Sequence, residues 1–391
     1  MHSSGICARV APMRVLFLNQ YFPPDPAPTG MLLRELADAL EETGHVVDFV
    51  DAGECYRGEK RSRGRMRREM KALARVLAGG LRCRRPDVIE SASSTPCVLV
   101  VATALALWRR AGSVHWLMDM YPEIAVALGE IRPGAFSGAI ARLMAWCYRR
   151  TDRVVALDAD MAARLIAYSV DVAVVRPWVF PAVIERIPAA LHIAPKPEWT
   201  WIYSGNLGRA HDWATLLEVQ AILENRGAPC RLLFQGGGPA WLPARARAEE
   251  LGLKNCAWSG YVEEEQLPRS LLACQLLVVT QLPAAQGLLW PSKLALAVTL
   301  PRPLLWIGPT NGAVAGLLRT LPHAGVFSAG QAAQIADWII ALKERPPSIE
   351  RNATFDAARH RESSLKQLTM LILEAGERRP QQSSKSAAQI T

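Results

Sequence analysis

Short apolar runs alternate with longer amphipathic stretches along most of the chain, and this alternation constrains the fold more than any other feature. Short apolar runs are typical of buried strands, and apolar residues at helical spacing are typical of helices that cover a sheet. A repeated strand–helix–strand order indicates parallel sheets and an α/β fold, because parallel strands need a crossover connection. The predicted strands are Arg14–Asn19, Val46–Asp51, Asp87–Glu90, Ser113–Met118, Arg153–Leu157, Val172–Val175, Thr200–Ser204, Arg231–Gln235, Leu276–Thr280 and Leu304–Ile307.

A proline-rich segment divides this series into two halves of similar size. Residues 177–197 contain five prolines and show no periodic pattern, which is typical of a connection. We therefore predict an N-terminal domain over residues 13–178, a linker over 179–198 and a C-terminal domain over 199–345. A terminal helix is expected over residues 346–375, and the polar residues 376–391 are expected to form a disordered tail.

Composition excludes several classes of protein. Half of the residues are hydrophobic and 21% are charged, which is the balance of a globular chain. The longest strongly apolar stretch, Val98–Trp108, has 11 residues, whereas a helix needs about 20 to span a bilayer. The first residues lack the apolar core of a secretory signal, and the eight cysteines contain no Cys-x-x-Cys pair. We therefore expect a cytoplasmic protein with no metal site and no bound cofactor.

The positive charge of the chain is concentrated in one segment. Residues 57–85 carry twelve basic and two acidic side chains, a net charge of +10, whereas the whole chain carries +9. Within this segment Met66, Met70, Leu73 and Leu77 recur at helical spacing, which predicts a basic amphipathic helix. We expect this apolar stripe to pack on the sheet, with the basic residues on the other faces of the helix.

Such a helix has three possible roles: binding anionic lipid, binding nucleic acid, or packing inward with a solvated basic face. Nucleic acid is the weakest of these, because no aromatic residue on which a base could stack occurs from Arg57 to Leu107. If lipid is the partner, electrostatic attraction dominates and the membrane-facing residues are Arg63, Arg65, Arg67, Arg68 and Lys71.

Three glycine turns lie where parallel sheets bind ligands, at the carboxyl ends of predicted strands. Gly205 and Gly208 precede Arg209 and a predicted helix, residues 236–238 are three consecutive glycines after the next strand, and Gly30 ends the loop after the first strand. Glycine lets a backbone approach phosphate closely, and helix N-termini attract it. The three turns together predict a site for a nucleoside diphosphate.

Charged side chains near other element ends are further candidates. Lys293 follows Ser292 at a predicted helix start, where a cation opposes the helix dipole; a bound anion would explain it, and solvent exposure is the alternative. Asp119 and Glu123 follow a strand, so they could accept a proton or cap a helix. Asp158 and Asp160 resemble an Asp-x-Asp metal motif, but they lie between a strand and a helix, so we interpret them as caps.

These segments together resemble family 4 of the retaining glycosyltransferases, which have the GT-B fold of two facing Rossmann-like domains. The resemblance covers about Arg14 to Leu342. It rests on Asn19–Asp25 with Thr29 and Gly30, Met118–Glu123, Tyr203–Arg209, Gly236–Pro239, Gly260–Val262 and Pro291–Leu294. The Pro-Ser-Lys sequence most resembles bacterial enzymes that build surface polysaccharides, often on a polyprenyl diphosphate carrier.

The resemblance implies a role for each matching residue. The second domain would bind an NDP-sugar without a metal ion, and Asp119 would lie beside the acceptor or the reacting sugar as the catalytic residue. The implied donor-binding residues are Gly30, Gly205, Asn206, Gly208, Arg209, Gly237, Tyr261, Val262, Gly287, Ser292 and Lys293. The implied partners are an NDP-sugar, a polyprenyl-linked acceptor and the anionic inner face of the cell membrane, with no nucleic acid.

The chain also departs from the family pattern. Members usually carry a Glu-x7-Glu pair whose second glutamate binds the donor ribose, but the second position here is Leu296, and for the first the chain offers only Gln286 nearby. Pro301 replaces the glycine that commonly ends the following helix, and Met118 replaces a histidine. A noncatalytic membrane-associated scaffold partner of other transferases is therefore one alternative, and an NDP-sugar epimerase on the same fold is another.

Overall fold

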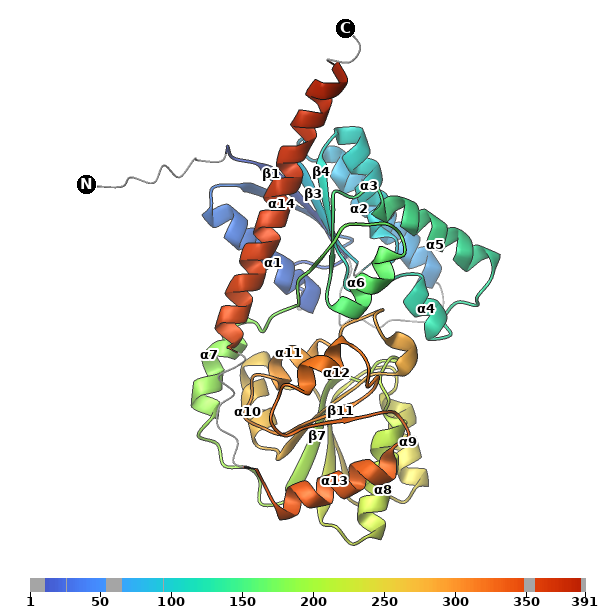
Figure 1. Ribbon diagram of the computed structural model, residues 1–391, viewed down its shortest axis with the longest axis vertical. Helices are drawn as coiled ribbons and strands as arrows, with labels where there is room; N and C mark the ends of the chain where they lie inside the picture. The colour runs from blue at the N-terminus through green and yellow to red at the C-terminus, as the bar shows by residue number, and fades with distance from the viewer. Residues whose placement is uncertain (1–10, 26, 54–64, 94, 348–355, 388–391) are drawn as a thin grey trace, which may run out of the picture.

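The protein contains two parallel β-sheets, each covered by helices (Figure 1). The computed structural model describes residues 11–25, 27–53, 65–93, 95–347 and 356–387. The N-terminal sheet consists of β1 (Arg14–Leu18), β2 (Val46–Val50), β3 (Val88–Ala92), β4 (Gly112–Trp116), β5 (Arg153–Ala156) and β6 (Val172–Val174). The C-terminal sheet consists of β7 (Trp199–Asn206), β8 (Cys230–Gly237), β9 (Cys256–Ser259), β10 (Leu276–Thr280), β11 (Leu304–Ile307) and β12 (Ala324–Phe327).

The strand order of each sheet is that of a doubly wound fold. The N-terminal order is β2-β1-β3-β4-β5-β6 and the C-terminal order is β12-β11-β10-β7-β8-β9, and the paired strands are parallel. The C-terminal order is that of a Rossmann domain, in which the chain reverses direction between its first and fourth strands. The predicted α/β class with two Rossmann-like domains is confirmed.

Helices connect the strands, as parallel pairing requires. In the N-terminal half they are α1 (Pro28–Glu42), α2 (Arg65–Arg82), α3 (Val98–Arg109), α4 (Glu123–Ala127), α5 (Ala135–Tyr148), α6 (Ala159–Ile166) and α7 (Pro181–Ala190). In the C-terminal half they are α8 (Ala214–Asn225), α9 (Trp241–Glu250), α10 (Leu267–Leu272), α11 (Lys293–Ala297), α12 (Ala313–Leu318), α13 (Ala332–Glu344) and α14 (Ala357–Ala387), with short 3-10 turns at Glu264–Gln266 and Pro283–Ala285. No helix within the described ranges is both long and apolar enough to cross a membrane.

Three segments differ from the sequence-based expectations. The linker contains helix α7, which begins with Pro181 in its first turn, a position where proline suits a helix. Helix α14 extends to Ala387, beyond residue 375, where the terminal helix was expected to end. Strands β9 and β12, both only partly buried, were not predicted.

Helix α2 forms as predicted, but its apolar stripe packs inward only in part, since Leu73 alone of its described members packs against the buried core. Met70 and Leu77 are exposed, whereas Ala72 and Val76 are buried. The helix lies too close to its neighbours for large side chains, since a Cβ atom added at Gly80 would clash with Leu105 of α3. Met66 and Arg65 have no described side chains, and Arg63 lies outside the described residues.

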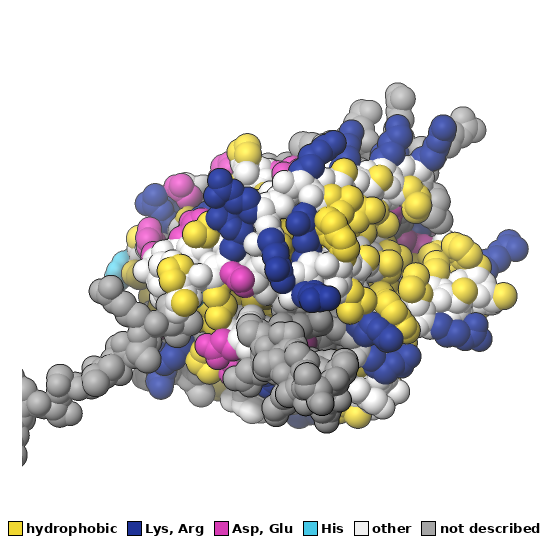
Figure 2. Space-filling view, turned by 90° about the horizontal axis from the view of Figure 1, so that it is seen from above, with side chains coloured by type: hydrophobic (Ala, Val, Ile, Leu, Met, Phe, Trp, Pro, Cys, Tyr) yellow, Lys and Arg dark blue, Asp and Glu magenta, His cyan; other side chains and the backbone are white. Residues whose placement is uncertain are grey.

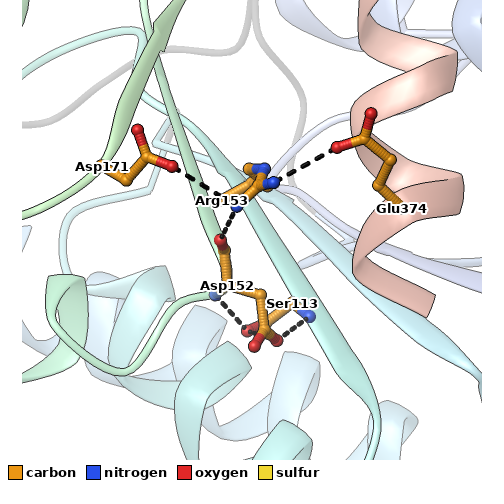
Figure 3. A network of polar contacts seen from close by, with 5 residues as sticks. All are labelled: Ser113, Asp152, Arg153, Asp171 and Glu374. Carbon is orange, nitrogen blue, oxygen red and sulfur yellow. Dashed lines mark hydrogen bonds and ion pairs between the residues drawn. The ribbon is translucent and has the colours of Figure 1, made fainter. Parts of the chain in front are cut away.

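The terminal helix returns to the N-terminal domain, where α14 lies beside β4 and α1 (Figure 1). Arg153 of β5 forms ion pairs with Glu374 of α14 at 3.2 Å and with Asp171 at 3.5 Å (Figure 3). Nearby, the carboxylate of Asp152 accepts hydrogen bonds from the backbone N–H and the hydroxyl of Ser113. The ion pair between Arg153 and Glu374 joins α14 to the first domain. The chain therefore connects the two domains twice.

One carboxyl group is buried in the N-terminal sheet without a partner. Glu90 of β3 is 1% exposed, and it lies between Phe17 of β1 and Val114 of β4 in the ladder. Neither of its carboxyl oxygens has a hydrogen-bond partner among the described residues. Burial raises its pKa well above the usual range, so Glu90 is protonated in the folded protein.

We predict that Glu90→Gln removes a pH-dependent loss of stability. The unfolded chain releases this proton near the ordinary pKa of 4.5, whereas the folded protein retains it, so the wild type loses up to about 1.4 kcal/mol per pH unit above that value. Urea unfolding between about pH 5 and pH 7 measures the free energy of unfolding of both proteins. The value for the variant should increase relative to that of the wild type as pH rises. A constant difference would show that Glu90 is ionised in the fold.

Candidate active site

The carboxyl ends of β7 and β10 form the point where the C-terminal sheet reverses its strand order. These two strands are hydrogen-bonded neighbours, although the chain visits β8 and β9 between them. In doubly wound folds the crevice at such a reversal is where ligands bind. Gly205 and Asn206 end β7, and Thr280 ends β10, so these residues border the crevice.

Lys293 extends into this crevice from the start of α11. Its ammonium group donates hydrogen bonds to the carbonyl oxygen of Asn206 at 3.1 Å and to Nε2 of His211 at 3.2 Å. The same nitrogen lies 4.8 Å from the ring centroid of Tyr203. An ammonium group has three N–H donors; these contacts use two of them among the described residues, which leaves the third for a ligand.

His211 holds the ammonium group of Lys293, a role that was not predicted from the sequence. Its Nδ1 lies 2.8 Å from the carbonyl oxygen of Thr280, which can only accept, so Nδ1 carries the proton and Nε2 accepts from Lys293. Burial, followed by the charge of Lys293, lowers the pKa of His211 to about 3, so the imidazole stays neutral. No pattern around His211 in the sequence indicates this role, because it depends on a strand end 69 residues away.

The environment of Lys293 makes its charge responsive to a ligand. Burial lowers the pKa of Lys293 to about 7, because the crevice offers it neutral acceptors and an aromatic ring but no carboxylate partner. An anion placed beside the ammonium group would favour the charged form and raise this pKa. Lys293 can therefore gain a proton when an anion binds.

The glycine turns bring the backbones of β7 and β8 into contact around this crevice. Gly205 has a φ of +118°, and a Cβ atom there would lie 3.0 Å from Cε of Lys293. Gly236, with a φ of +131°, leaves no space for a side chain beside the carbonyl oxygen of Gly205. A Cβ atom on Gly237 would lie 2.9 Å from the ring of Tyr261. Gly205, Asn206, Gly237, Tyr261 and Lys293 thus lie close together at the ends of β7 and β8.

Arg209 points across the gap between the domains. Its guanidinium lies 3.5 Å from a carboxylate oxygen of Glu130, which precedes α5 in the N-terminal domain. The arginine side chain is 58% exposed, so this ion pair contributes little to stability. The carboxylate of Glu130 therefore lies beside Arg209, where the resemblance to family 4 implies a phosphate.

Asp119 lies beyond the end of β4, at the seam with the C-terminal domain. It pairs with Leu289 in an isolated antiparallel bridge, and the N–H of Met120 donates to the carbonyl oxygen of Leu288 at 2.8 Å. The backbone N–H of Asp119 contacts Oγ of Ser93 at 2.9 Å. Burial raises the pKa of the Asp119 carboxyl to about 6, so it is mostly ionised at neutral pH.

Asp158 and Asp160 have different partners. The carboxylate of Asp158 accepts from the N–H of Met161, which confirms its prediction as the cap of α6. Asp160 instead joins the domains: its Oδ2 accepts from the backbone N–H of Ala313 at 2.9 Å and from the side-chain amide of Gln286 at 3.1 Å. The described residues contain no group of three His, Cys, Asp or Glu side chains placed to hold a metal ion.

The remaining predicted donor-site residues lie at several places. Gly30 is buried in the first turn of α1, where a Cβ atom would lie 2.7 Å from the carbonyl oxygen of Tyr21. Gly287 has a φ of +66° and lies against the backbone of Asp160 at the seam. Ser292 is exposed beside Lys293, Val262 follows Tyr261, and Gly208 lies near the ring of His211.

Neither Leu296, at the second position of the expected glutamate pair, nor Gln286, near the first, carries a charge. Leu296 is buried in the hydrophobic core. The amide of Gln286 is directed to Asp160. The structure therefore offers no carboxylate at either position, in agreement with the departure seen in the sequence.

Comparison with known proteins agrees with this fold. Residues 29–182, which cover most of the N-terminal domain, match the model of Glycosyltransferase Family 4. No curated protein sequence matches the chain. Sucrose-phosphate synthase from Thermosynechococcus elongatus has a similar structure, with a TM-score of 0.63, 14% identity, and coverage of 96% of this chain and 99% of that one.

Two further structures align over nearly their whole length. The catalytic domain of starch synthase IV from Arabidopsis thaliana, bound to ADP and acarbose, has a TM-score of 0.60 and 12% identity, covering 94% of this chain and 100% of that one. Anabaena HepE in complex with UDP has a TM-score of 0.52 and 16% identity, covering 96% and 100%. The chain therefore shares the GT-B fold of these proteins, and its residues 29–182 match the Glycosyltransferase Family 4 model.

The bridge between Asp119 and Leu289 lies at the seam between the two domains, and Asp160 joins the domains there. We predict that Asp160→Ala opens the seam, because the N–H of Ala313 and the amide of Gln286 lose their acceptor, a loss of about 1–3 kcal/mol. Small-angle X-ray scattering should show a larger radius of gyration for this variant.

The matched control is Asp158→Ala, two residues earlier. It removes only the cap of α6, which costs about 1 kcal/mol, and it should leave the scattering curve unchanged. Identical curves for both variants and the wild type would mean that Asp160 does not hold the domains together.

Proposed function

We propose that the protein transfers a sugar from an NDP-sugar to a lipid-linked acceptor, with retention of configuration, in the synthesis of a surface polysaccharide. The observation that carries this proposal is the placement of Lys293 at the strand-order reversal of the C-terminal sheet, with an N–H donor left for an anion. The similar structures bound to ADP and UDP support a nucleoside diphosphate as that anion.

On the donor side, the chain would supply its own positive charge. Lys293 would contact the diphosphate, and Arg209 would exchange Glu130 for a phosphate oxygen. Negative charge develops on the diphosphate as its bond to the sugar breaks, and fixed cations stabilise that charge without a metal ion. The glycine turns at Gly205 and Gly237 would admit the donor, with Tyr261 and Val262 beside the base.

On the acceptor side, Asp119 is the candidate catalytic residue. The acceptor hydroxyl loses a proton as its oxygen bonds to the sugar, and a carboxylate with a pKa of about 6 is ionised at neutral pH and can accept it. Asp119 already lies at the seam with the segment that leads to Lys293. Both halves of the reaction would therefore meet between the two sheets.

A lipid-linked acceptor would place the protein at the cytoplasmic face of the membrane. Arg67 and Lys71 of α2 are exposed and Arg68 is half-buried, so part of the predicted basic surface is available to anionic lipid. Attraction to such a surface contributes about 1 kcal/mol per basic side chain. The protein would thus attach peripherally.

One observation favours a second candidate function. Leu296 is buried in the core, at the position where members of family 4 usually carry the glutamate that binds the donor ribose. A noncatalytic partner of other transferases could keep the fold and the membrane surface while losing turnover. Donor binding without any sugar transfer to polyprenyl-linked acceptors would support this alternative.

We predict that Arg209→Ala and Lys293→Ala each weaken binding of a nucleoside diphosphate by about 1.5–3 kcal/mol, the range for hydrogen bonds to charged groups. Isothermal titration with UDP, ADP and GDP in turn should show Kd values about 10- to 150-fold higher for the best ligand. The same titration of the wild type in EDTA should give an unchanged Kd.

Arg245→Ala is the matched control. Its side chain is 56% exposed and ion-paired to Glu249 on α9, much as Arg209 is paired to Glu130. This control should bind as the wild type does. Unchanged affinity in both site variants would remove the donor-site assignment, and affinity that requires a divalent ion would contradict the metal-free proposal.

A further inference from the structure

Exposed hydrophobic side chains gather on one layer of the N-terminal domain. Fourteen large hydrophobic residues are exposed in the part of the chain that the structure describes, and eight of them lie on α2, α3 and α5. Helix α3 lies between the other two and contacts both. Figure 2, viewed from the end formed by this domain, shows hydrophobic side chains beside lysine and arginine side chains.

The most exposed of these side chains belong to α3 and α5, outside the basic segment found in the sequence. Trp108 at the end of α3 is 60% exposed, and Phe136 at the start of α5 is 61% exposed. Leu143 and Trp146 continue the outer face of α5 at helical spacing from Phe136. Helix α5 is therefore amphipathic, with Met144, Cys147 and Tyr148 on its buried face.

The charge on this layer has one sign. The three helices contain a single acidic residue, Glu69, and residues 98–110 and 131–150 contain none. Arginines accompany the exposed aromatic rings: the guanidinium of the exposed Arg150 lies 4.1 Å from the ring centroid of Trp146. That of Arg109 lies 4.2 Å from the ring of Trp108 and also donates to the carbonyl oxygens of Leu81 and Cys83.

The sign of the charge decides between two kinds of partner. Tryptophan, phenylalanine and arginine also occur at the centre of protein interfaces, but a layer with many basic side chains and one acidic residue, Glu69, attracts an anionic surface such as acidic lipid. Here arginines alternate with the apolar residues, as on helices that lie in the headgroup region of a bilayer, where the guanidinium binds phosphate and the aromatic ring enters the acyl boundary.

We propose that the outer face of α3 and α5, together with α2, inserts apolar side chains into an anionic lipid bilayer. This inference rests on the proposed membrane attachment and changes its nature: binding has a salt-resistant apolar part, centred on Trp108, Phe136, Leu143 and Trp146. The exposure of Met70 and Leu77 on α2 adds to that part.

The position of α5 relates this surface to the seam. The chain runs from Asp119 through α4 and Glu130 directly to Phe136 at the start of α5. A bilayer that holds the start of α5 would therefore lie close to the acceptor side of the candidate active site. A lipid-linked acceptor could reach Asp119 without leaving the membrane surface.

The test is flotation with vesicles of phosphatidylcholine, with and without phosphatidylglycerol, at low and high salt. Trp108→Ser combined with Phe136→Ser should lower the partition coefficient for anionic vesicles at high salt about tenfold or more, because each aromatic side chain removed takes away the burial of one large apolar group. The matched control is Leu242→Ser with Met370→Ser, two residues that are 73% and 50% exposed on α9 and α14.

The outcomes separate this inference from the proposed function. Binding of the wild type that survives high salt, falls in the aromatic variant and persists in the control supports insertion. Binding that high salt abolishes, equally in all variants, overturns insertion but keeps electrostatic attachment. Absence of binding to any vesicle overturns both, and a wild-type dimer that the aromatic variant dissociates in light scattering would assign this face to a second copy of the chain.

Discussion

Two hydrogen bonds hold Lys293 at the end of β7, and the candidate site is built around this lysine. A parallel sheet that reverses its strand order must leave a crevice between the strands on either side. Here that crevice contains a cation with neutral acceptors only, Asn206 and His211, beside the ring of Tyr203. A cation shielded from water without a counter-ion is costly, so the surroundings of Lys293 favour the binding of an anion.

The seam between the domains couples this crevice to the opposite sheet. Gln286 is hydrogen-bonded to Asp160, and the same segment pairs with Asp119 a few residues later. Arg209 reaches Glu130 across the gap. These polar contacts add to a buried hydrophobic cluster that contains residues of both domains, among them Met120, Ile124 and Leu288, and α14 returns to the first domain.

Local patterns in the sequence were sufficient for the strands and for the glycine turns, because buried strands and positive-φ glycines leave strong signals. They were misleading for α2, where small residues such as Ala72 allow close packing and the large residue Met70 faces outward. They could not reveal His211, whose role depends on Thr280, or Asp160, whose partners belong to the other domain. Contacts between distant segments have no local signature.

The number of protons taken up when UDP binds measures directly whether Lys293 becomes charged beside the diphosphate. The pKa of Lys293 in the empty site is about 7, so at about pH 8 the amine is mostly neutral, and a diphosphate beside it should raise that pKa and draw in close to one proton. Titration calorimetry in buffers of different ionisation enthalpy should measure that uptake in the wild type and almost none in Lys293→Met. Binding without proton uptake in the wild type, or equal uptake in the variant, would mean that Lys293 does not bind the diphosphate.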